Sequence, residues 1–344
     1  MAQDGRPGRR RAFIGSFTAA GGPGVVAAEV APDGSLALVV AVNDVPDPSY
    51  LVLAPDGETL YTVSETAEGS VAAYRLVGDR PELAGPPVPV NGSGPTHLAV
   101  YDGHVLTANY GCGSVTAVPL RPDGALAAKH SGRLQHTGSG PHDRRQRGPH
   151  AHQVQPDPSG RWAVSVDLGT DSVRICTLDN GTPALHREFA LRPGSGPRHL
   201  AFHPGGALAY VVNELTPTVT VCRWDPETGS LRPLTEVPVL SDAPAGDAYP
   251  SGIAVSPDGR FVWTATRGED VLSVLAVEGE ALRLIGTVPC GGHWPRALAE
   301  HNGYLYAANE RSGEVTWFAV DEATGLPCYD GSVRVPAASC VVFG

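Results

Sequence analysis

The sequence predicts an all-β fold, a seven-bladed β-propeller with four antiparallel strands in each blade. Three observations support this prediction. First, the 344 residues include 42 glycines and 32 prolines, a composition that favours short strands joined by turns. Second, a strand–turn–strand pattern recurs at intervals of 45 to 54 residues, near the period of propeller blades. Third, the segments that flank the repeats at both ends are strand-like and would complete one further blade.

Each repeat contains a proline, a polar residue, an apolar strand, a turn, a second apolar strand, a glycine-containing loop and a valine-rich third strand. "PSGIAVSPDGRFVWTATRGEDVLSVLAV" is a clear copy. Alternation of apolar and polar residues in these segments excludes a helical solenoid. The six copies begin at or near Pro48, Pro95, Pro149, Pro197, Pro250 and Pro295.

The six copies leave residues 12–47 and 321–344 for a seventh blade. "RAFIGSF" and "CVVFG" are strand-like, and pairing them in one sheet would close the ring and remove its exposed edges. We therefore assign residues 12–344 to one propeller domain and residues 1–11 to a flexible basic tail. "RRRAFIG" resembles a twin-arginine export signal, but Gly-Gly-Pro-Gly interrupts the segment after it, so we expect a tail instead.

Composition narrows the classes of partner. A formal charge of −11 argues against nucleic acid, and no run of 18 apolar residues is present that could span a membrane. The six cysteines are scattered without CxxC spacing, which favours isolated thiols in a reducing cytoplasm over a zinc site or a disulfide framework. We expect a cytoplasmic protein and treat it as a monomer, although the sequence does not fix the oligomeric state.

Alignment of the copies reveals two columns of polar residues. Because strands one and two form a hairpin, the start of one lies beside the end of the other. If strand one is innermost, both columns converge at one end of a central channel, where a substrate would bind. The column before strand one holds Ser49, Thr96, His152, Arg198, Ser251 and Arg296. The column after strand two holds Ser64-Glu65, Asn109-Tyr110, Asp167-Leu168, Asn213-Glu214, Thr266-Arg267 and Asn309-Glu310.

The uncharged and charged residues of the columns differ in how well a purely structural role explains them. Asn and Asp at strand ends commonly bond only to turn backbones, so a structural role remains open for them. The charged residues vary from blade to blade, which a repeated scaffold does not explain. His97 and His199 stand one position further along, and strand alternation predicts them on the opposite side as packing or inter-blade residues.

A basic loop, residues 129–152, leads into the copy that begins near Pro149 and contains the pair His150 and His152. It carries Lys129, Arg133, Arg144, Arg145 and Arg147 against the single acid Asp143. This local positive charge could attract a phosphate or carboxylate group of a substrate. A solvated loop that only aids solubility is an equal alternative.

Linked motifs in order along the chain then indicate a family. "RQRGPHAH", "VDLGTD", "GPRHLAFHP", "VVNEL", "YPSGIAVSPDGRFVWTATRG" and "WPRALA" resemble the seven-bladed lactonase family. That family includes propeller-type 6-phosphogluconolactonases and carboxymuconate-lactonising enzymes. The resemblance covers residues 12–344 and implies a metal-independent hydrolase without a cofactor. It also implies His152, Arg198, Glu214 and Arg267 as active-site residues, the positions that the columns select.

These residues suit lactone hydrolysis. His152 would act as the general base, with Glu214 orienting it or serving as an alternative acid or base. Arg198 and Arg267 would bind the substrate's anionic group and the developing oxyanion. His150 and His152 form a His-x-His pair that could instead bind a metal, but the close arginines argue against a cation. Further substrate contacts are expected from His150, Asn109, Asp167, Asn213, Arg296, Asn309 and Glu310.

The expected substrate is a small anionic lactone, 6-phosphogluconolactone or a related sugar-acid lactone, which would place the enzyme in carbohydrate metabolism and the pentose phosphate pathway. A muconate-type lactonising isomerase and a lactonase for another carboxylated ring are alternatives. A propeller that only binds partners is a third alternative. Charged channel residues favour an enzyme, because a binding platform more often uses exposed aromatic patches on its rim.

Overall fold

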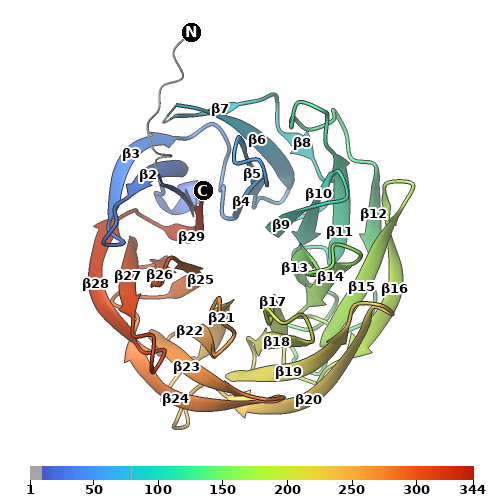
Figure 1. The fold of residues 1–344 in the computed structure, drawn as a ribbon. Coiled ribbons are helices and arrows are strands. Elements are labelled where there is room, and N and C mark those ends of the chain that lie inside the picture. Colours follow the sequence, from blue (N-terminus) through green and yellow to red (C-terminus); the bar gives the residue numbers. More distant parts are fainter. Residues whose placement is uncertain (1–9, 79) are drawn as a thin grey trace.

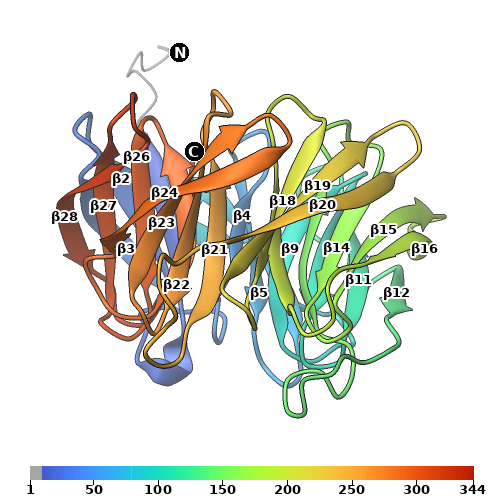
Figure 2. The same cartoon turned by 90° about the horizontal axis from the view of Figure 1, so that it is seen from below.

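The computed structural model describes residues 10–78 and 80–344, and across these residues the strands form seven antiparallel sheets. Figure 1 shows the sheets arranged as a ring around a central axis, and Figure 2 shows them side by side around that ring. The predicted all-β, seven-bladed propeller is confirmed. In the same described ranges, no helix is long and apolar enough to cross a membrane. Most of the predicted tail, residues 1–9, lies outside them.

Each sheet runs from an inner strand at the axis to an outer strand at the rim. One sheet contains, in that order, β29 (Ala338–Phe343), β1 (Arg11–Ser16), β2 (Val25–Val30) and β3 (Leu36–Val42). The next contains β4 (Leu51–Leu53), β5 (Thr59–Ser64), β6 (Ser70–Val77) and β7 (Arg80–Leu83), with β8 (Val88–Pro89) also paired to β6. The third contains β9 (Pro95–Tyr101), β10 (His104–Asn109), β11 (Ser114–Pro119) and β12 (Gly132–Gln135).

The remaining sheets follow chain order without exception. They contain β13 (Ala151–Pro156), β14 (Ala163–Asp167), β15 (Ser172–Asp179) and β16 (Thr182–Ala190); and β17 (Pro197–Phe202), β18 (Leu208–Asn213), β19 (Thr218–Asp225) and β20 (Ser230–Pro238). They end with β21 (Tyr249–Val255), β22 (Phe261–Arg267), β23 (Val271–Glu278) and β24 (Ala281–Pro289); and β25 (Pro295–His301), β26 (Tyr304–Asn309), β27 (Glu314–Val320) and β28 (Pro327–Arg334). A short 3-10 helix, Thr18–Ala20, follows β1.

The ring is closed by strands from opposite ends of the chain. β29 pairs antiparallel with β1, from Ala12 opposite Phe343 to Ile14 opposite Val341. The backbone N–H of Arg11 adds a hydrogen bond to the carbonyl of Gly344 at 3.2 Å. This pairing is the predicted closure; it covers the inner edge of β1 and makes β29 the innermost strand of the sheet.

The hydrophobic core lies between neighbouring sheets. In one cluster, Ile14 and Val26 of the closing sheet pack with Tyr306 and Trp317 of the adjacent sheet. All six residues of β18 are buried, because this second strand is covered on both of its faces. Blade-to-blade packing therefore fixes the inner strands, whose ends carry the polar columns.

A β-bulge occurs at the same position in the inner strand of five sheets, one of them β29, where Ser339 is skipped. In β17, Pro197 pairs with Asn213 and His199 pairs with Val212, which leaves Arg198 without a partner residue. Thr96, His152 and Arg296 are skipped in the same way. Bulges re-aim side chains and are common beside active sites. Thr96, His152, Arg198 and Arg296 are members of the polar column that the sequence analysis selected, and Ser339 holds the equivalent position in β29.

The bulge also explains why strand alternation predicted the wrong side for two histidines. His97 and His199 were expected on the opposite side of the strand, as packing or inter-blade residues. They are buried and contact each other between sheets, as expected for inter-blade residues, but they face the axis and line a cavity of about 530 Å³. Their rings lie 5.4 Å apart, although they come from β9 and β17 in non-adjacent sheets. The extra residue interrupts the two-residue period, so His199 follows Arg198 toward the axis.

Ring closure should dominate stability at the β1–β29 seam. Replacing the fully buried Ile14 by alanine removes apolar contacts and leaves a cavity, so we expect the free energy of unfolding to fall by about 2–5 kcal/mol. Urea unfolding followed by circular dichroism measures it. The control is Leu38→Ala on the outer strand β3, where the side chain is 43% exposed; an equal loss in the control would contradict the seam's importance.

Candidate active site

Glu214 stands at the centre of the site. It follows β18 directly, its side chain is buried, and three guanidinium groups contact its carboxylate. Arg198 Nε lies 3.1 Å from Oε2, and Arg267 Nη2 lies 2.8 Å from the same oxygen. Arg145 Nη2 donates to Oε1. The three arginines come from β17, from the end of β22 and from the basic loop, so one carboxylate joins three separate elements.

The charges at this cluster do not balance. Three guanidinium groups surround one carboxylate, so Glu214 leaves two positive charges without compensation. Burial alone would raise the pKa of the Glu214 carboxyl, but Arg267, Arg198 and Arg145 hold that pKa well below its usual range. Burial, helped by the charge of Arg267, lowers the pKa of Arg198 to about 9, so it remains protonated at neutral pH. The cluster therefore suits an anionic ligand.

His152 lies beside the cluster on β13. Its Nε2 is 4.0 Å from Glu214 Oε2, and its Nδ1 is buried without a hydrogen-bond partner. Burial, followed by the nearby Arg198 charge, lowers the pKa of His152 well below its ordinary value. The imidazole is consequently neutral at neutral pH, as a general base must be.

Tyr110 and His150 position Arg145 within the basic loop. The Tyr110 hydroxyl accepts a hydrogen bond from Arg145 Nη2 at 3.1 Å, and the Tyr110 ring stacks on His150 with 4.5 Å between centroids. His150 Nδ1 lies 2.8 Å from the Tyr110 carbonyl oxygen. Burial raises the pKa of Tyr110, so its hydroxyl stays protonated. These contacts hold Arg145 against Glu214.

A second ionic group lies on β25 and its neighbours. Arg296 contacts Glu310 at 3.3 Å and Glu65 at 3.4 Å, and its guanidinium lies 4.8 Å from the centroid of the Phe17 ring. The Ser49 hydroxyl donates to Glu65. Burial raises the pKa of the Glu65 carboxyl, and Arg296 opposes that shift. The predicted contacts Arg296 and Glu310 therefore meet, together with the Glu65 carboxylate from a second sheet.

The asparagines of the second column are bonded within their own sheets. Asn109 Nδ2 donates to Ser114 Oγ and Thr116 Oγ1 at 3.0 and 2.9 Å. Asn213 and Asn309 make equivalent bonds to threonines of the third strand. All three are fully buried. Their amides tie strand two to strand three, which is the structural alternative for this column, so we do not propose them as substrate contacts.

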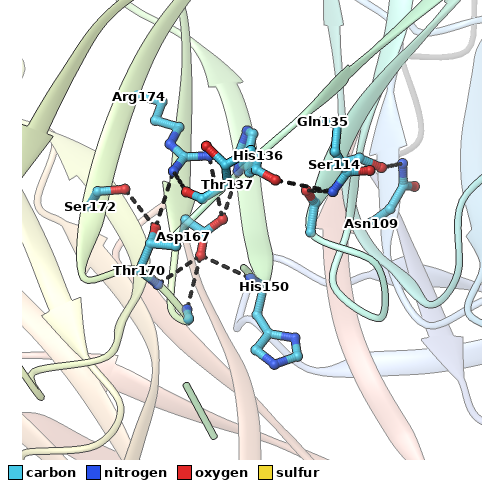
Figure 3. A network of polar contacts seen from close by, with 12 residues as sticks. Asn109, Ser114, Gln135, His136, Thr137, His150, Asp167, Thr170, Ser172 and Arg174 are labelled. Carbon is cyan, nitrogen blue, oxygen red and sulfur yellow. Dashed lines mark hydrogen bonds and ion pairs between the residues drawn. The ribbon is translucent and has the colours of Figure 1, made fainter. Parts of the chain in front are cut away.

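Asp167 has a similar role, drawn in Figure 3. Its Oδ2 lies 2.6 Å from His136 Nδ1. Its Oδ1 accepts hydrogen bonds from the backbone N–H groups of His150, Gly169 and Thr170 at 2.9 to 3.1 Å. The carboxylate thus fixes the backbone at His150, next to the bulged His152, and direct contact of Asp167 with substrate stays an untested prediction.

Two cavities lie next to the site. One, of about 690 Å³, lies at the basic loop, and the central one of about 530 Å³ is lined by inner-strand residues. Arg145 lines the first and contacts Glu214, whereas His199 lines the second and lies 5.1 Å from the His152 ring. Over residues 10–78 and 80–344, no group of three or more His, Cys, Asp or Glu is placed to hold a metal ion.

This arrangement agrees with a known family. The family model described as "Lactonase, 7-bladed beta-propeller" matches residues 11–343. The chain belongs to the seven-bladed β-propeller lactonase family. The resemblance expected from the motifs is confirmed, and the enzyme is a lactone hydrolase.

Individual relatives span the same length. A 6-phosphogluconolactonase from Bacillus subtilis is 33% identical over 342 residues, which cover 96% of this chain and 97% of that protein. The structure of a putative 6-phosphogluconolactonase from Bacteroides fragilis superposes with a TM-score of 0.91 at 27% identity and covers 100% of both chains. A periplasmic gluconolactonase from Pseudomonas aeruginosa superposes at 0.88 with 28% identity, covering 97% of this lactonase and 98% of the other.

Three residues at the site were not among the predicted ones: Arg145, Tyr110 and Glu65. Tyr110 and Glu65 stand in the same column as Glu214, directly after strand two, so the alignment of the copies could have identified them as site residues. The basic loop pointed to Arg145 only as one of several arginines. Which of them turns inward depends on the stacked Tyr110 and His150 rings, which the sequence does not reveal.

Glu214→Gln should destabilise the fold strongly. The substitution keeps the side chain's shape but leaves three guanidinium groups without a counter-charge, so we expect a loss of about 3–5 kcal/mol in the free energy of unfolding. Urea unfolding measures this. Glu280→Gln breaks an exposed ion pair with Arg223 and is the matched control. It should barely change the free energy of unfolding. Equal effects of both substitutions would refute a special role for the buried carboxylate.

Proposed function

We propose that this lactonase hydrolyses a lactone that carries an anionic group, with 6-phosphogluconolactone as the leading substrate. The observation that carries the proposal is the uncompensated positive charge around Glu214, next to the neutral imidazole of His152. The Bacillus subtilis relative is named for this lactone and supports the choice. A phosphate or carboxylate would supply the charge that the three arginines lack.

The reaction would begin with His152 as general base. Its imidazole takes a proton from a water molecule, and the water oxygen attacks the lactone carbonyl carbon. The carbonyl oxygen becomes negative in the tetrahedral intermediate, and Arg198 with Arg267 stabilises it. The ring C–O bond then breaks, and the protonated imidazole returns its proton to the leaving oxygen. The product is a hydroxy acid, which ionises to a carboxylate.

Glu214 would act as a fixed anion in this mechanism. Because the surrounding arginines lower its pKa, it is ionised and cannot donate a proton at neutral pH. At 4.0 Å from His152 Nε2, its charge favours the imidazolium that forms during proton transfer. Of the two roles expected for Glu214, orientation and charge stabilisation agree with this environment better than acid–base catalysis.

A second candidate is an unphosphorylated sugar lactone. Glu65 and Glu310 flank Arg296, and carboxylates readily accept hydrogen bonds from sugar hydroxyl groups. The Pseudomonas aeruginosa neighbour is named as a gluconolactonase. The ratio of kcat/KM for 6-phosphogluconolactone and gluconolactone separates the two candidates.

We also propose the cytoplasm as the compartment. All six cysteines lie in the described ranges and are free thiols, as expected in a reducing environment. The periplasmic neighbour makes fractionation of the native host the deciding measurement.

Removal of the base should abolish most turnover. We expect His152→Ala to lower kcat about 10²–10⁴-fold, and Arg198→Ala to lower it about 10²–10³-fold. A panel of 6-phosphogluconolactone, gluconolactone and a carboxylated muconolactone tests both variants. His186→Ala on the outer strand β16 should retain full activity, because that side chain is exposed far along the sheet from the axis. Unchanged turnover in both site variants would disprove the assignment, and failure of folded wild type on every lactone would disprove the function.

The loss of activity on the acid side of the pH profile should occur at an unusually low pH. A base works only when unprotonated, and burial together with Arg198 lowers the pKa of His152. The pH at which kcat/KM falls by half on the acid side should therefore lie below the ordinary histidine value of 6.5. Initial rates between about pH 4.5 and 8, corrected for spontaneous hydrolysis, measure this. A midpoint above 6.5 would contradict the buried neutral imidazole.

A further inference from the structure

One position recurs at one end of the central channel, directly before the proline or alanine that leads into each inner strand. In six sheets its carbonyl accepts a hydrogen bond from the backbone N–H of the residue directly after the second strand, as Gly196 does from Glu214 at 2.7 Å and Trp294 from Glu310 at 3.1 Å. In the seventh sheet, Tyr249 pairs with Arg267 in the sheet register. These rim residues are Asp47, Gly94, His150, Gly196, Tyr249, Trp294 and Ala337.

The backbone at several rim positions is left-handed. φ is +56° at Gly94, +61° at Gly196 and +45° at Asp47, residue types that tolerate this region, and it is +52° at Ala337. Trp294 has φ of +66° at the equivalent position. A bulky residue is strained there, and such strain is concentrated at functional sites. The Trp294 N–H donates to Asp270 Oδ1 at 2.8 Å, which helps to hold the conformation.

The Trp294 indole adjoins the catalytic arginines. Arg267 Cζ, whose guanidinium contacts Glu214, lies 5.6 Å from its ring centroid, and Arg311 Cζ lies 3.3 Å from it. The Tyr249 ring lies 6.3 Å away, and Tyr249 lines the cavity of about 690 Å³ together with Arg144 and Arg145. The two aromatic side chains thus extend from the buried cluster to the open cavity.

Trp294 also differs from the other tryptophans in its burial. Trp162, Trp224, Trp263 and Trp317 are at most 8% exposed and belong to the cores between sheets. Trp294 is only half-buried and belongs to no core cluster of the described residues. Core packing and backbone preference do not account for a tryptophan at this position; its indole stacks with the Arg311 guanidinium and stays partly accessible to a ligand.

We propose that Trp294 and Tyr249 form an aromatic platform that packs against the ring of the lactone substrate. The inference rests on the proposed function and assigns its positioning residues. The C–H face of a sugar ring covers the indole, while the anionic group reaches the arginines and the carbonyl reaches His152. The platform selects cyclic lactones over open-chain esters of the same charge, because only a ring presents a flat face.

Kinetics of three variants test this. Trp294→Gly and Trp294→Asn accept the positive φ but remove the ring, so KM for 6-phosphogluconolactone should rise about tenfold with little change in kcat. Trp294→Phe keeps a ring and should stay within about threefold of wild type. Tyr329→Ala, an exposed aromatic on β28, is the control and should leave KM unchanged. Unchanged KM in the folded Gly and Asn variants overturns the platform.

Melting temperature separates a binding role from a structural one. Because Gly relieves the left-handed strain at residue 294, Trp294→Gly should melt no more than about 2 °C below wild type. A binding residue gives raised KM with nearly unchanged melting. A large fall in melting temperature in both the Gly and Asn variants, with KM restored on cooling, marks a structural role and overturns the proposal.

Intrinsic fluorescence gives a readout that is independent of turnover. Titration of 6-phosphogluconate or gluconate into wild type should change tryptophan emission, and Trp294→Phe should lose that change while calorimetry still detects binding. If wild type hydrolyses no lactone, the proposed function fails, and this titration alone then decides the platform: no change in emission with bound ligand overturns it. Hydrolysis with unaltered emission on binding overturns the platform only.

Discussion

One buried carboxylate holds the active site together. Without Glu214, the guanidinium groups of Arg145, Arg198 and Arg267 would repel one another in a region with little water. With it, the basic loop is tied to β17 and β22, so the loop is a fixed wall of the site. Because two positive charges remain, the same cluster that binds the loop is still prepared to bind an anion.

The propeller places two electrostatically different groups around one axis. Arg145, Arg198 and Arg267 form a cationic group, whereas Arg296 lies between the carboxylates of Glu65 and Glu310. A substrate with an anion at one end and hydroxyl groups at the other matches this division. Under the proposed function, this division of charge would orient a lactone before His152 contributes any chemistry.

Much of the fold was predictable because each blade repeats a local signal. Proline, turn and apolar strand recur at a regular interval, and the bulged column could be found by alignment alone, including His152 and Arg198. The orientation of His199 could not be predicted, because a β-bulge shifts the alternation of side chains along the strand and no residue pattern in the sequence reveals it. The partners of Asp167 and Arg145 were also hidden, since they depend on packing of His136 and of the Tyr110–His150 stack.

The seam between β1 and β29 also sets the order of events in biosynthesis. β1 is the first of the described strands to be made, yet its inner partner is the last, since Ala12 pairs with Phe343. Synthesis of a chain of this length takes on the order of tens of seconds, and throughout that time one edge of β1 has no partner. A ribosome that stalls before β29 releases an open ring with an adhesive edge. A chain that ends before β29 therefore exposes the inner edge of β1, which can pair with a strand of another chain.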